Sequence, residues 1–340
     1  MLTRRVRRCS IFAFGLALTG SMASAVPPAA PLDFVPWRAD FHMHIRSQTA
    51  YDTEAVMCAT FGPGACHLNT EHQARSGADA IAAFEEVGAK KGVVLSMAYM
   101  FGAPSVAAQH YDVARMTRAE NEYVAEQVAA HPDKLVGFFG VDPLSFSALD
   151  EVRYWARDGR LKGLKLHFAN SEVNLRDPAQ VKQIAAVVVL AGKNRLPINF
   201  HLSTGEKFGA EDTEIFIRDI LAPAGDPWVQ LSHAGGFGGS DELMFKVLRV
   251  FAAHIARHDP AARHVLFDLA SVVSAKTTAQ EAADLVELMR KIGLSRFVVG
   301  SDFDGVTPKA TDEFDREKLP LSQVEWRTVV QSCVPWVCEK

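Results

Sequence analysis

The chain has 340 residues, of which 48% are hydrophobic and 22% are charged, a composition typical of a folded enzyme with a large core. The formal net charge of -4 and the pI of about 6.3 leave no broad basic surface, which argues against nucleic acid as a partner. We therefore expect a small-molecule substrate, and the sequence leaves a homo-oligomer open.

The first 25 residues have the order of a secretory signal peptide. Four arginines (Arg4, Arg5, Arg7 and Arg8) precede the apolar run 11–18, and Ala23-Ser24-Ala25 supplies small residues for cleavage. The apolar run is short for a membrane span, and no later run reaches about 18 apolar residues. We expect cleavage near Ala25, a periplasmic or secreted mature protein of residues 26–340, and no stable membrane insertion. The paired arginines leave the twin-arginine route open beside general secretion.

Cleavage would leave four cysteines in two local pairs, Cys58 with Cys66 and Cys333 with Cys338. An oxidising compartment favours two local disulfides. Gly62-Pro63-Gly64 lets the first loop turn back, and Pro335 bends the second. A zinc cluster is the alternative, although neither pair has the C-x-x-C spacing usual in such sites.

After the proline-rich stretch 27–36, apolar runs suited to buried parallel strands alternate with amphipathic helical patterns. The predicted strands are Ala39–Ile45, Gly92–Ala98, Leu135–Val141, Gly163–Phe168, Leu196–His201, Trp228–His233, Val265–Ala270 and Arg296–Asp302. The predicted helices are Ala78–Ala89, Arg118–Ala130, Leu149–Arg157, Ala179–Ala191, Thr213–Leu221, Glu242–Ile255, Thr278–Ile292 and Ser322–Trp336. Eight such units predict a single α/β domain with the (β/α)8 TIM barrel fold.

A doubly wound open sheet is the alternative fold. It is less favoured because an open sheet would not readily bring polar residues of the first strand beside those of the last. Two βα connections, residues 46–76 and 99–115, are longer than usual, and connections of this length are commonly functional or mobile. We expect them to form much of the pocket wall.

Imidazole and carboxylate groups stand at the ends of four of the predicted strands: His42 and His44, His201, His233, and Asp302. Side chains alternate along a strand, so His42 and His44 point the same way with Met43 opposed. A closed parallel barrel gathers the C-terminal strand ends at one mouth. Neutral imidazole and carboxylate suit a divalent metal, with zinc the default and iron, manganese or nickel open.

The chain resembles the amidohydrolase superfamily and, within it, the amidohydrolase-related branch, from residue 38 to about 336. The matching motifs are Asp40-Phe41-His42-Met43-His44, Gly163-Leu164-Lys165-Leu166-His167, His201, Leu231-Ser232-His233-Ala234-Gly235-Gly236 and Gly300-Ser301-Asp302. The resemblance implies that His42, His44, His201 and Asp302 bind one metal, that Asp302 also takes a proton from water, and that His233 acts in acid–base catalysis. It allows a second ion if Lys165 is carboxylated; an ion pair or an anionic substrate is the other reading of Lys165.

Several further polar residues have two readings each. His167 lines the pocket or is a plain wall residue; Asp304 orients a ligand or caps a turn; Arg46 binds a substrate carboxylate or, as favoured, is solvated. His67, His72, His110 and Tyr111 fall in the long connections without informative spacing. Gly235, Gly236, Gly238 and Gly239 lack the lysine and hydroxyl residue of a P-loop and predict flexible backbone at the mouth.

Three functions remain open from the sequence. The first is a metal-dependent hydrolase in which metal-activated water attacks a carboxylic amide, ester or lactone, with Asp302 and His233 transferring protons. The second, implied by the resemblance, is a metal-dependent non-oxidative decarboxylase of an aromatic or dienoic acid. The third is a catalytically inactive binding barrel.

Overall fold

The structure is a computed structural model of the chain, and it describes residues 31–61, 73–108, 112–205 and 207–338. Eight parallel strands form one sheet in the order β1 to β8. They are β1 (Ala39–Met43), β2 (Lys91–Leu95), β3 (Leu135–Gly140), β4 (Gly163–His167), β5 (Ile198–His201), β6 (Val229–Leu231), β7 (Val265–Asp268) and β8 (Phe297–Val298). Each strand pairs with its sequence neighbour, which is the topology of a (β/α)8 barrel.

The barrel closes where the chain beyond β8 meets β1. The Phe41 amide donates to the Val299 carbonyl at 3.0 Å, and Met43 and Phe303 form a parallel bridge. This closure confirms the predicted barrel and excludes the open doubly wound sheet. β8 is short, and these bonds continue the pairing with β1 through the segment after β8.

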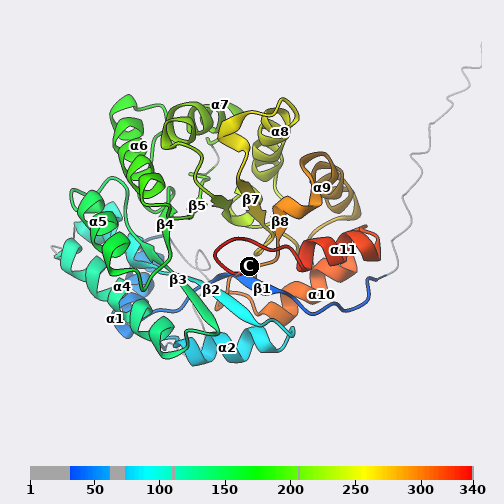
Figure 1. Cartoon of the computed structure of the whole chain (residues 1–340), viewed down its shortest axis with the longest axis horizontal. Helices are drawn as coiled ribbons and strands as arrows, with labels where there is room; N and C mark the ends of the chain where they lie inside the picture. Colours follow the sequence, from blue (N-terminus) through cyan, green and yellow to red (C-terminus); the bar gives the residue numbers. More distant parts are fainter. Residues whose placement is uncertain (1–30, 62–72, 109–111, 206, 339–340) are drawn as a thin grey trace, which may run out of the picture.

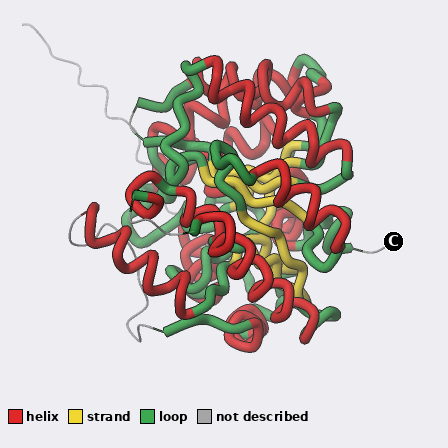
Figure 2. Tube along the Cα trace, turned by 90° about the vertical axis from the view of Figure 1, so that its left-hand side faces the viewer, coloured by secondary structure: helices red, strands yellow, loops and turns green. Residues whose placement is uncertain are grey.

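Helices surround the strands, as Figure 1 shows along the barrel axis and Figure 2 from the side. They are α1 (Gln48–Phe61), α2 (Gly77–Glu85), α3 (Pro104–Ala107), α4 (Val113–Ala130), α5 (Ala148–Asp158), α6 (Pro178–Lys193), α7 (Ala210–Ile215), α8 (Glu242–Ala256), α9 (Ala279–Ile292), α10 (Pro308–Lys318) and α11 (Gln323–Val330). Shorter turns are the 3₁₀ helices η1 (Ala98–Gly102), η3 (Ala222–Ala224), η4 (Ser232–Gly235), η5 (Pro260–Ala262) and η6 (Leu294–Arg296) and the π-helix η2 (Phe216–Leu221).

Local sequence explains where many of these helices begin. Ser76, Thr278 and Ser322 each form a capping box at the start of α2, α9 and α11, where the side chain accepts a bond from a free backbone amide. Asp177 caps α6 and is followed by Pro178, whose missing N–H costs nothing at the first helical position. These signals agree with the predicted starts of the helices.

Several helical predictions differ from the structure. The connection 46–76 contains the helix α1, and α10, which begins after the Thr307 cap with Pro308 at its first turn, was not predicted. The last helix ends at Val330 instead of Trp336. It ends early because Val334 and Val337 turn back and pack with the apolar side chains inside the barrel.

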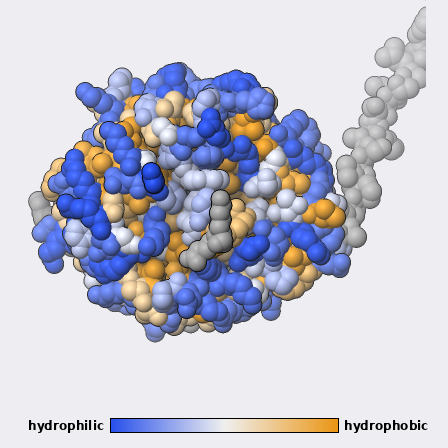
Figure 3. All heavy atoms as spheres, in the orientation of Figure 1, coloured by the Kyte–Doolittle hydropathy of each residue, from blue (hydrophilic) through white to orange (hydrophobic). Residues whose placement is uncertain are grey.

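The barrel interior changes character along its axis. At the N-terminal end of the strands it is apolar, with Ala39, Val93, Val136, Leu266 and Val298 in one cluster that Val334 and Val337 cover. In Figure 1 the C-terminal segment crosses this end of the barrel, and Figure 3 shows the same face with hydrophilic and hydrophobic side chains interspersed. Towards the C-terminal ends the inner side chains are polar, so the functional groups collect at that mouth. A second, larger cluster packs the strands against the helices.

Some predictions concern residues outside the described ranges: the signal peptide, Cys66, His67, His72, His110 and Tyr111. The structure joins the sulfurs of Cys333 and Cys338, whose Cα atoms lie 5.9 Å apart. Within the described ranges, no helix has the length and apolar character needed to cross a bilayer.

A buried carboxylate ties the first long connection to the helical layer. Glu120 of α4 accepts hydrogen bonds from the Ser47 amide (3.1 Å) and the Ser47 hydroxyl (2.5 Å), directly before α1. Burial raises the pKa of Glu120 from 4.5 to about 7, against the opposing effect of the Ser47 bonds. The Glu120 carboxyl group therefore binds its proton more tightly in the folded protein than in the unfolded chain.

The Glu120→Gln variant tests this coupling. A raised carboxyl pKa contributes stability that is present below pH 4.5 and is lost as the pH rises through about 7. The difference in unfolding free energy, variant minus wild type, should therefore rise by about 2 kcal/mol from pH 5 to pH 8, measured by urea denaturation. A difference that stays constant over this pH range would contradict the burial argument.

Candidate active site

The closing contact of the barrel brings the first strand to the segment after the last one. The Asp302 amide donates to the His42 carbonyl at 2.8 Å. The Nε2 atoms of His42 and His44 lie 3.1 Å apart, and the Asp302 Oδ1 atom lies 3.4 Å from His42 Nε2 and 3.5 Å from His44 Nε2. Met43 packs on the outer side of the strand, as the alternation predicts.

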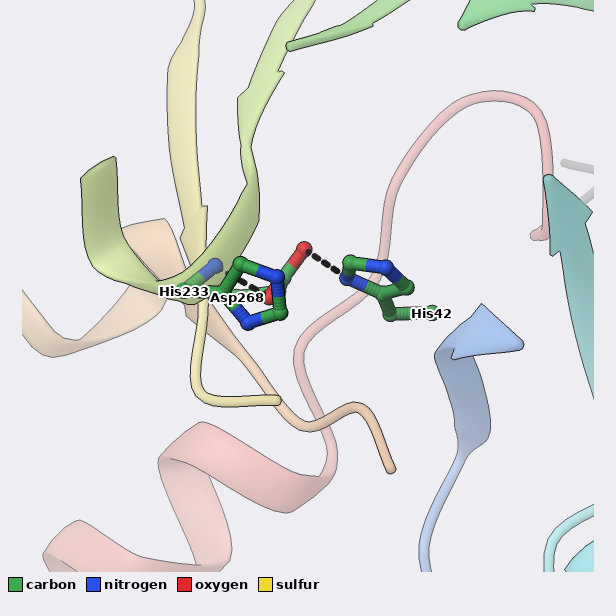
Figure 4. A group of neighbouring side chains, drawn as sticks. All are labelled: His42, His233 and Asp268. Carbon is green, nitrogen blue, oxygen red and sulfur yellow. Dashed lines mark hydrogen bonds and ion pairs between the residues drawn. The ribbon is translucent and has the colours of Figure 1, made fainter. Parts of the chain in front are cut away.

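A buried aspartate fixes the orientation of the His42 ring. Asp268, at the end of β7, lies 3.1 Å from His42 Nδ1 through its Oδ2 atom and accepts bonds from the His233 amide (2.9 Å) and Gln230 Nε2 (2.7 Å). Figure 4 shows the carboxylate between the His42 ring and the backbone of His233. Burial raises the pKa of Asp268, but the imidazole of His42 and the hydrogen bonds outweigh it and lower the pKa overall.

Sequence reasoning missed Asp268, because it lies inside an apolar run predicted as strand Val265–Ala270. A carboxylate at the C-terminal end of that run was the available signal. Its contact with one nitrogen of His42 leaves the other nitrogen to face His44 and Asp302, the arrangement common around histidine ligands of metals. His44 is held in the same way, with Nδ1 at 2.8 Å from the Leu95 carbonyl.

The donor set of His42, His44 and Asp302 fits a divalent metal. Two ligands at about 2.0–2.1 Å from a tetrahedral ion lie about 3.4 Å from one another, close to the observed spacings of 3.1 to 3.5 Å. Burial, reinforced by His42, lowers the pKa of His44 well below its usual range, while the three neighbouring imidazoles keep the pKa of Asp302 low despite burial. Neutral imidazole and ionised carboxylate are the forms that bind metals.

His201 and His233 lie beside this set. His201 stacks on His167 with ring centroids 3.9 Å apart, and its buried Nε2 has no hydrogen-bond partner in the described chain. It is not in either group of potential ligands whose donor atoms lie within 4.8 Å of one another, so its role as a metal ligand stays a prediction. His233 Nδ1 lies 2.7 Å from the Ala270 carbonyl, and His233 is in a second group with His42 and Asp268.

Lys165 is a buried ammonium group at the same mouth. Its side chain is 1% exposed, and Nζ donates to Asn199 Oδ1 (2.7 Å) and Ser232 Oγ (3.0 Å). Burial lowers its pKa to about 8, although the charges of Asp268 and Asp302 oppose the shift. In the described part of the chain no carboxylate forms an ion pair with it, so the ion-pair reading of Lys165 is not supported.

The prediction for Arg46 needs correction. The Arg46 side chain is only 4% exposed and forms ion pairs with Glu54 of α1 and with Asp304, so the solvated reading is wrong. The turn from Asp302 is present, since the Gly305 amide donates to the Asp302 carbonyl at 2.9 Å. The Asp304 side chain pairs with Arg46 and with Arg75 Nε (3.1 Å).

The candidate site surrounds one cavity of about 250 Å³. Its lining comprises His42, His44, Arg46, Glu54, Met97, Tyr99, Lys165, His167, His201, His233, Phe237, Ser271, Asp302, Asp304, Gly305 and Val306. As predicted, both long connections contribute to the wall, through Glu54 from the first and Tyr99 from the second. The glycine-rich segment also reaches the cavity, through Phe237.

The Asp268→Asn variant tests whether this aspartate supports metal binding. The amide cannot supply the charge that holds His42, so the affinity for Mn²⁺ or Zn²⁺ should fall by about 10- to 100-fold in a chelator competition titration. Asp315→Asn is the matched control, because Asp315 is equally buried but lies on α10. An unchanged affinity in Asp268→Asn, or an equal loss in both variants, would contradict the assignment.

Comparison with known structures places the fold. A 5-carboxyvanillate decarboxylase from Sphingomonas paucimobilis superposes with a TM-score of 0.58 at 16% identity, covering 87% of this chain and 97% of that one. A dihydroxybenzoic acid decarboxylase from a Polaromonas species, with bound manganese and 2-nitroresorcinol, gives 0.57 at 13%, covering 87% and 95%. A candidate 2-pyrone-4,6-dicarboxylic acid hydrolase from Pseudomonas putida gives 0.55 at 14%, covering 87% and 94%.

Most of these structural neighbours are named as decarboxylases of aromatic acids. No curated protein matches the sequence. The sequence profile of the amidohydrolase family matches residues 39–325, a span that includes every strand of the barrel. The chain therefore belongs to the amidohydrolase family.

Proposed function

We propose that this protein is a metal-dependent decarboxylase of an aromatic carboxylic acid. The observation that carries the proposal is the Lys165 ammonium group, which lines the cavity beside the imidazole and carboxylate cluster and has only neutral hydrogen-bond partners. A buried cation without a paired carboxylate favours an anionic ligand. Aromatic side chains of Tyr99 and Phe237 line the same cavity and suit a planar ring.

The structural neighbours support decarboxylation over the hydrolysis that the sequence alone favours. His42, His44 and Asp302 would hold one divalent ion, with His201 as a further ligand. Bound there, the ion would act as a Lewis acid on an oxygen atom of the substrate. Nitrogen and oxygen donors suit both zinc, the default from the sequence, and manganese, which is bound in the Polaromonas decarboxylase.

The residues of the chain supply binding and proton transfer. Lys165 attracts the substrate carboxylate. His233 Nδ1 is fixed to the Ala270 carbonyl, which leaves Nε2 to accept a phenolic proton and return it to the ring carbon. The bond between that carbon and the carboxylate breaks, its electron pair remains on the ring and forms the new C–H bond, and carbon dioxide leaves.

Carbon dioxide release tests the proposal. Manganese- or zinc-loaded protein should release carbon dioxide from 5-carboxyvanillate or a dihydroxybenzoate, and should incorporate deuterium into the ring in D₂O. His233→Asn should lower kcat by about 10²- to 10⁴-fold with metal content retained, because it removes the proton-transfer group. Lys165→Met should raise KM, whereas Lys162→Met, at an exposed lysine before the same strand, should not.

Hydrolysis remains the second candidate, because the Pseudomonas putida neighbour is a candidate hydrolase of a cyclic dicarboxylate. In that reaction Asp302 would take a proton from the attacking water, and Lys165 would bind a substrate carboxylate. Proton release from 2-pyrone-4,6-dicarboxylate without carbon dioxide release from any aromatic acid would replace the decarboxylase proposal with this one. Turnover of neither class would favour the inactive binding barrel.

We also propose that the protein is exported, cleaved near Ala25 and stabilised by the disulfides Cys58–Cys66 and Cys333–Cys338. The order of arginines, apolar run and small residues supports export. Intact mass measurement of the secreted fraction should find a chain beginning after Ala25 and no thiol that reacts with iodoacetamide before reduction. Recovery of the full-length chain from the cytoplasm, with free thiols, would contradict the proposal.

A further inference from the structure

We propose that Phe237 selects a planar, single-ring acid, by stacking on its ring and by closing one side of the catalytic cavity. The inference rests on the proposed function, because it takes the substrate to be an aromatic acid. It adds a specificity residue that neither the metal-ligand motifs nor the strand-end pattern contains.

The exposure of Phe237 is unusual for its position. Phe237 is 51% exposed, although the cavity that it borders is otherwise lined mainly by buried and half-buried residues. Phenylalanine is normally among the most buried residue types. A large apolar side chain that remains half exposed at the edge of a polar cavity is suited to contact with an apolar part of a ligand.

The backbone is fixed on both sides of Phe237. A Cβ atom on Gly235 would lie 2.4 Å from Val247 Cγ1, and one on Gly236 would lie 2.9 Å from Met244 Cβ, so this side packs tightly against α8. On the other side, Gly239 donates its amide to the Ser271 carbonyl at 2.7 Å. Phe237 is therefore held on a short segment anchored at both ends, beside the loop after β7.

The ring of Phe237 borders two cavities. On one side is the 250 Å³ cavity, where its centroid lies 5.0 Å from that of His201 at an interplanar angle of 85°. On the other is a cavity of about 510 Å³ lined by Gly205, Phe208, Asp241, Glu242, Leu243 and Lys246. Replacing the ring with a methyl group would therefore extend the smaller cavity towards the larger one.

Other rings continue from this contact along the cavity wall. His201 stacks on His167, and the Tyr99 ring lies next to His167, with the two ring centroids 4.9 Å apart. A flat ring entering beside the metal-ligand cluster meets aromatic faces and edges, for which stacked and edge-to-face contacts are favourable. An aliphatic ring of the same charge and size would not gain this contribution.

The test measures the binding of three carboxylates to manganese-loaded protein by isothermal titration calorimetry. Benzoate and cyclohexanecarboxylate have the same charge and ring size, and 2-naphthoate adds a second ring. Wild type should bind benzoate about two- to tenfold more tightly than cyclohexanecarboxylate and should bind 2-naphthoate least. Phe237→Leu should weaken the preference for benzoate, and Phe237→Ala should weaken it and also strengthen 2-naphthoate binding.

Phe146→Ala is the control, because Phe146 is 88% exposed and does not line the catalytic cavity. It should leave all three affinities unchanged. Metal content and circular dichroism establish that each variant is folded. Equal binding of benzoate and cyclohexanecarboxylate by wild type, no benzoate binding, or an unchanged preference in Phe237→Ala would each overturn the assignment.

Carbon dioxide release, measured in parallel, separates this inference from the proposed function. A benzoate preference that depends on Phe237, without carbon dioxide release from any acid, supports the role of Phe237 and contradicts decarboxylation. Carbon dioxide release with the same KM in wild type and Phe237→Ala supports decarboxylation and contradicts the role of Phe237.

Discussion

The contact between the first strand and the segment after the last one positions the candidate metal-binding cluster of His42, His44 and Asp302. A Cβ atom on Gly300 would lie 2.8 Å from His42 Cβ, so this close approach requires glycine. The approach allows the Asp302 amide to bond to the His42 carbonyl, and that bond places the Asp302 carboxylate beside both imidazoles of the first strand. The cluster therefore exists only when the barrel is closed, which couples the site to completion of the fold.

Burial gives the site its electrostatic character. Imidazoles packed together out of water favour their neutral forms, and burial lowers the pKa values of His44, His201 and His233. Asp302 remains ionised among them. Several buried polar atoms, including His201 Nε2 and Asp40 Oδ2, have no partner in the described chain. Such groups cost stability, and His201 Nε2, which lies in the cavity lining, is available to a ligand or a cation.

A second group of charged side chains at the cavity wall pair with one another. Arg46 and Arg75 pair with Asp304, and Arg46 also pairs with Glu54. Two guanidinium groups and two carboxylates balance each other, so this set links α1, the long first connection and the segment after β8. Lys165 has no such counter-ion among the described residues, which makes it the cation available to a substrate.

The barrel and the principal site residues were predictable because both follow from local patterns. Alternating apolar and amphipathic segments indicate the strands and helices, and the polar residues His42, His44 and Asp302 stand at strand ends. Asp268 was hidden inside an apolar run, and the Arg46–Asp304 pair joins residues far apart in sequence. The polar sequence of α10 gave little hydrophobic pattern, although Thr307 and Pro308 mark its start.

The reaction was less predictable than the fold. Hydrolysis and decarboxylation use the same ligands and differ in which substrate atom faces the proton-transfer group. That difference depends on the shape and charge of the wall, which residues from both long connections and the glycine-rich segment form together. We proposed decarboxylation in place of hydrolysis because the Lys165 ammonium group has only neutral hydrogen-bond partners and several structural neighbours are named as decarboxylases.

The most direct test of metal binding by His42, His44 and Asp302 is the metal content per chain, measured by inductively coupled plasma mass spectrometry on wild type, His44→Ala and His254→Ala. His254 is a buried histidine on α8, outside the cavity. We expect one equivalent of a divalent metal in wild type and in His254→Ala, and its loss in folded His44→Ala. Full metal content in His44→Ala, or no metal in wild type after reconstitution, would contradict metal binding by this cluster.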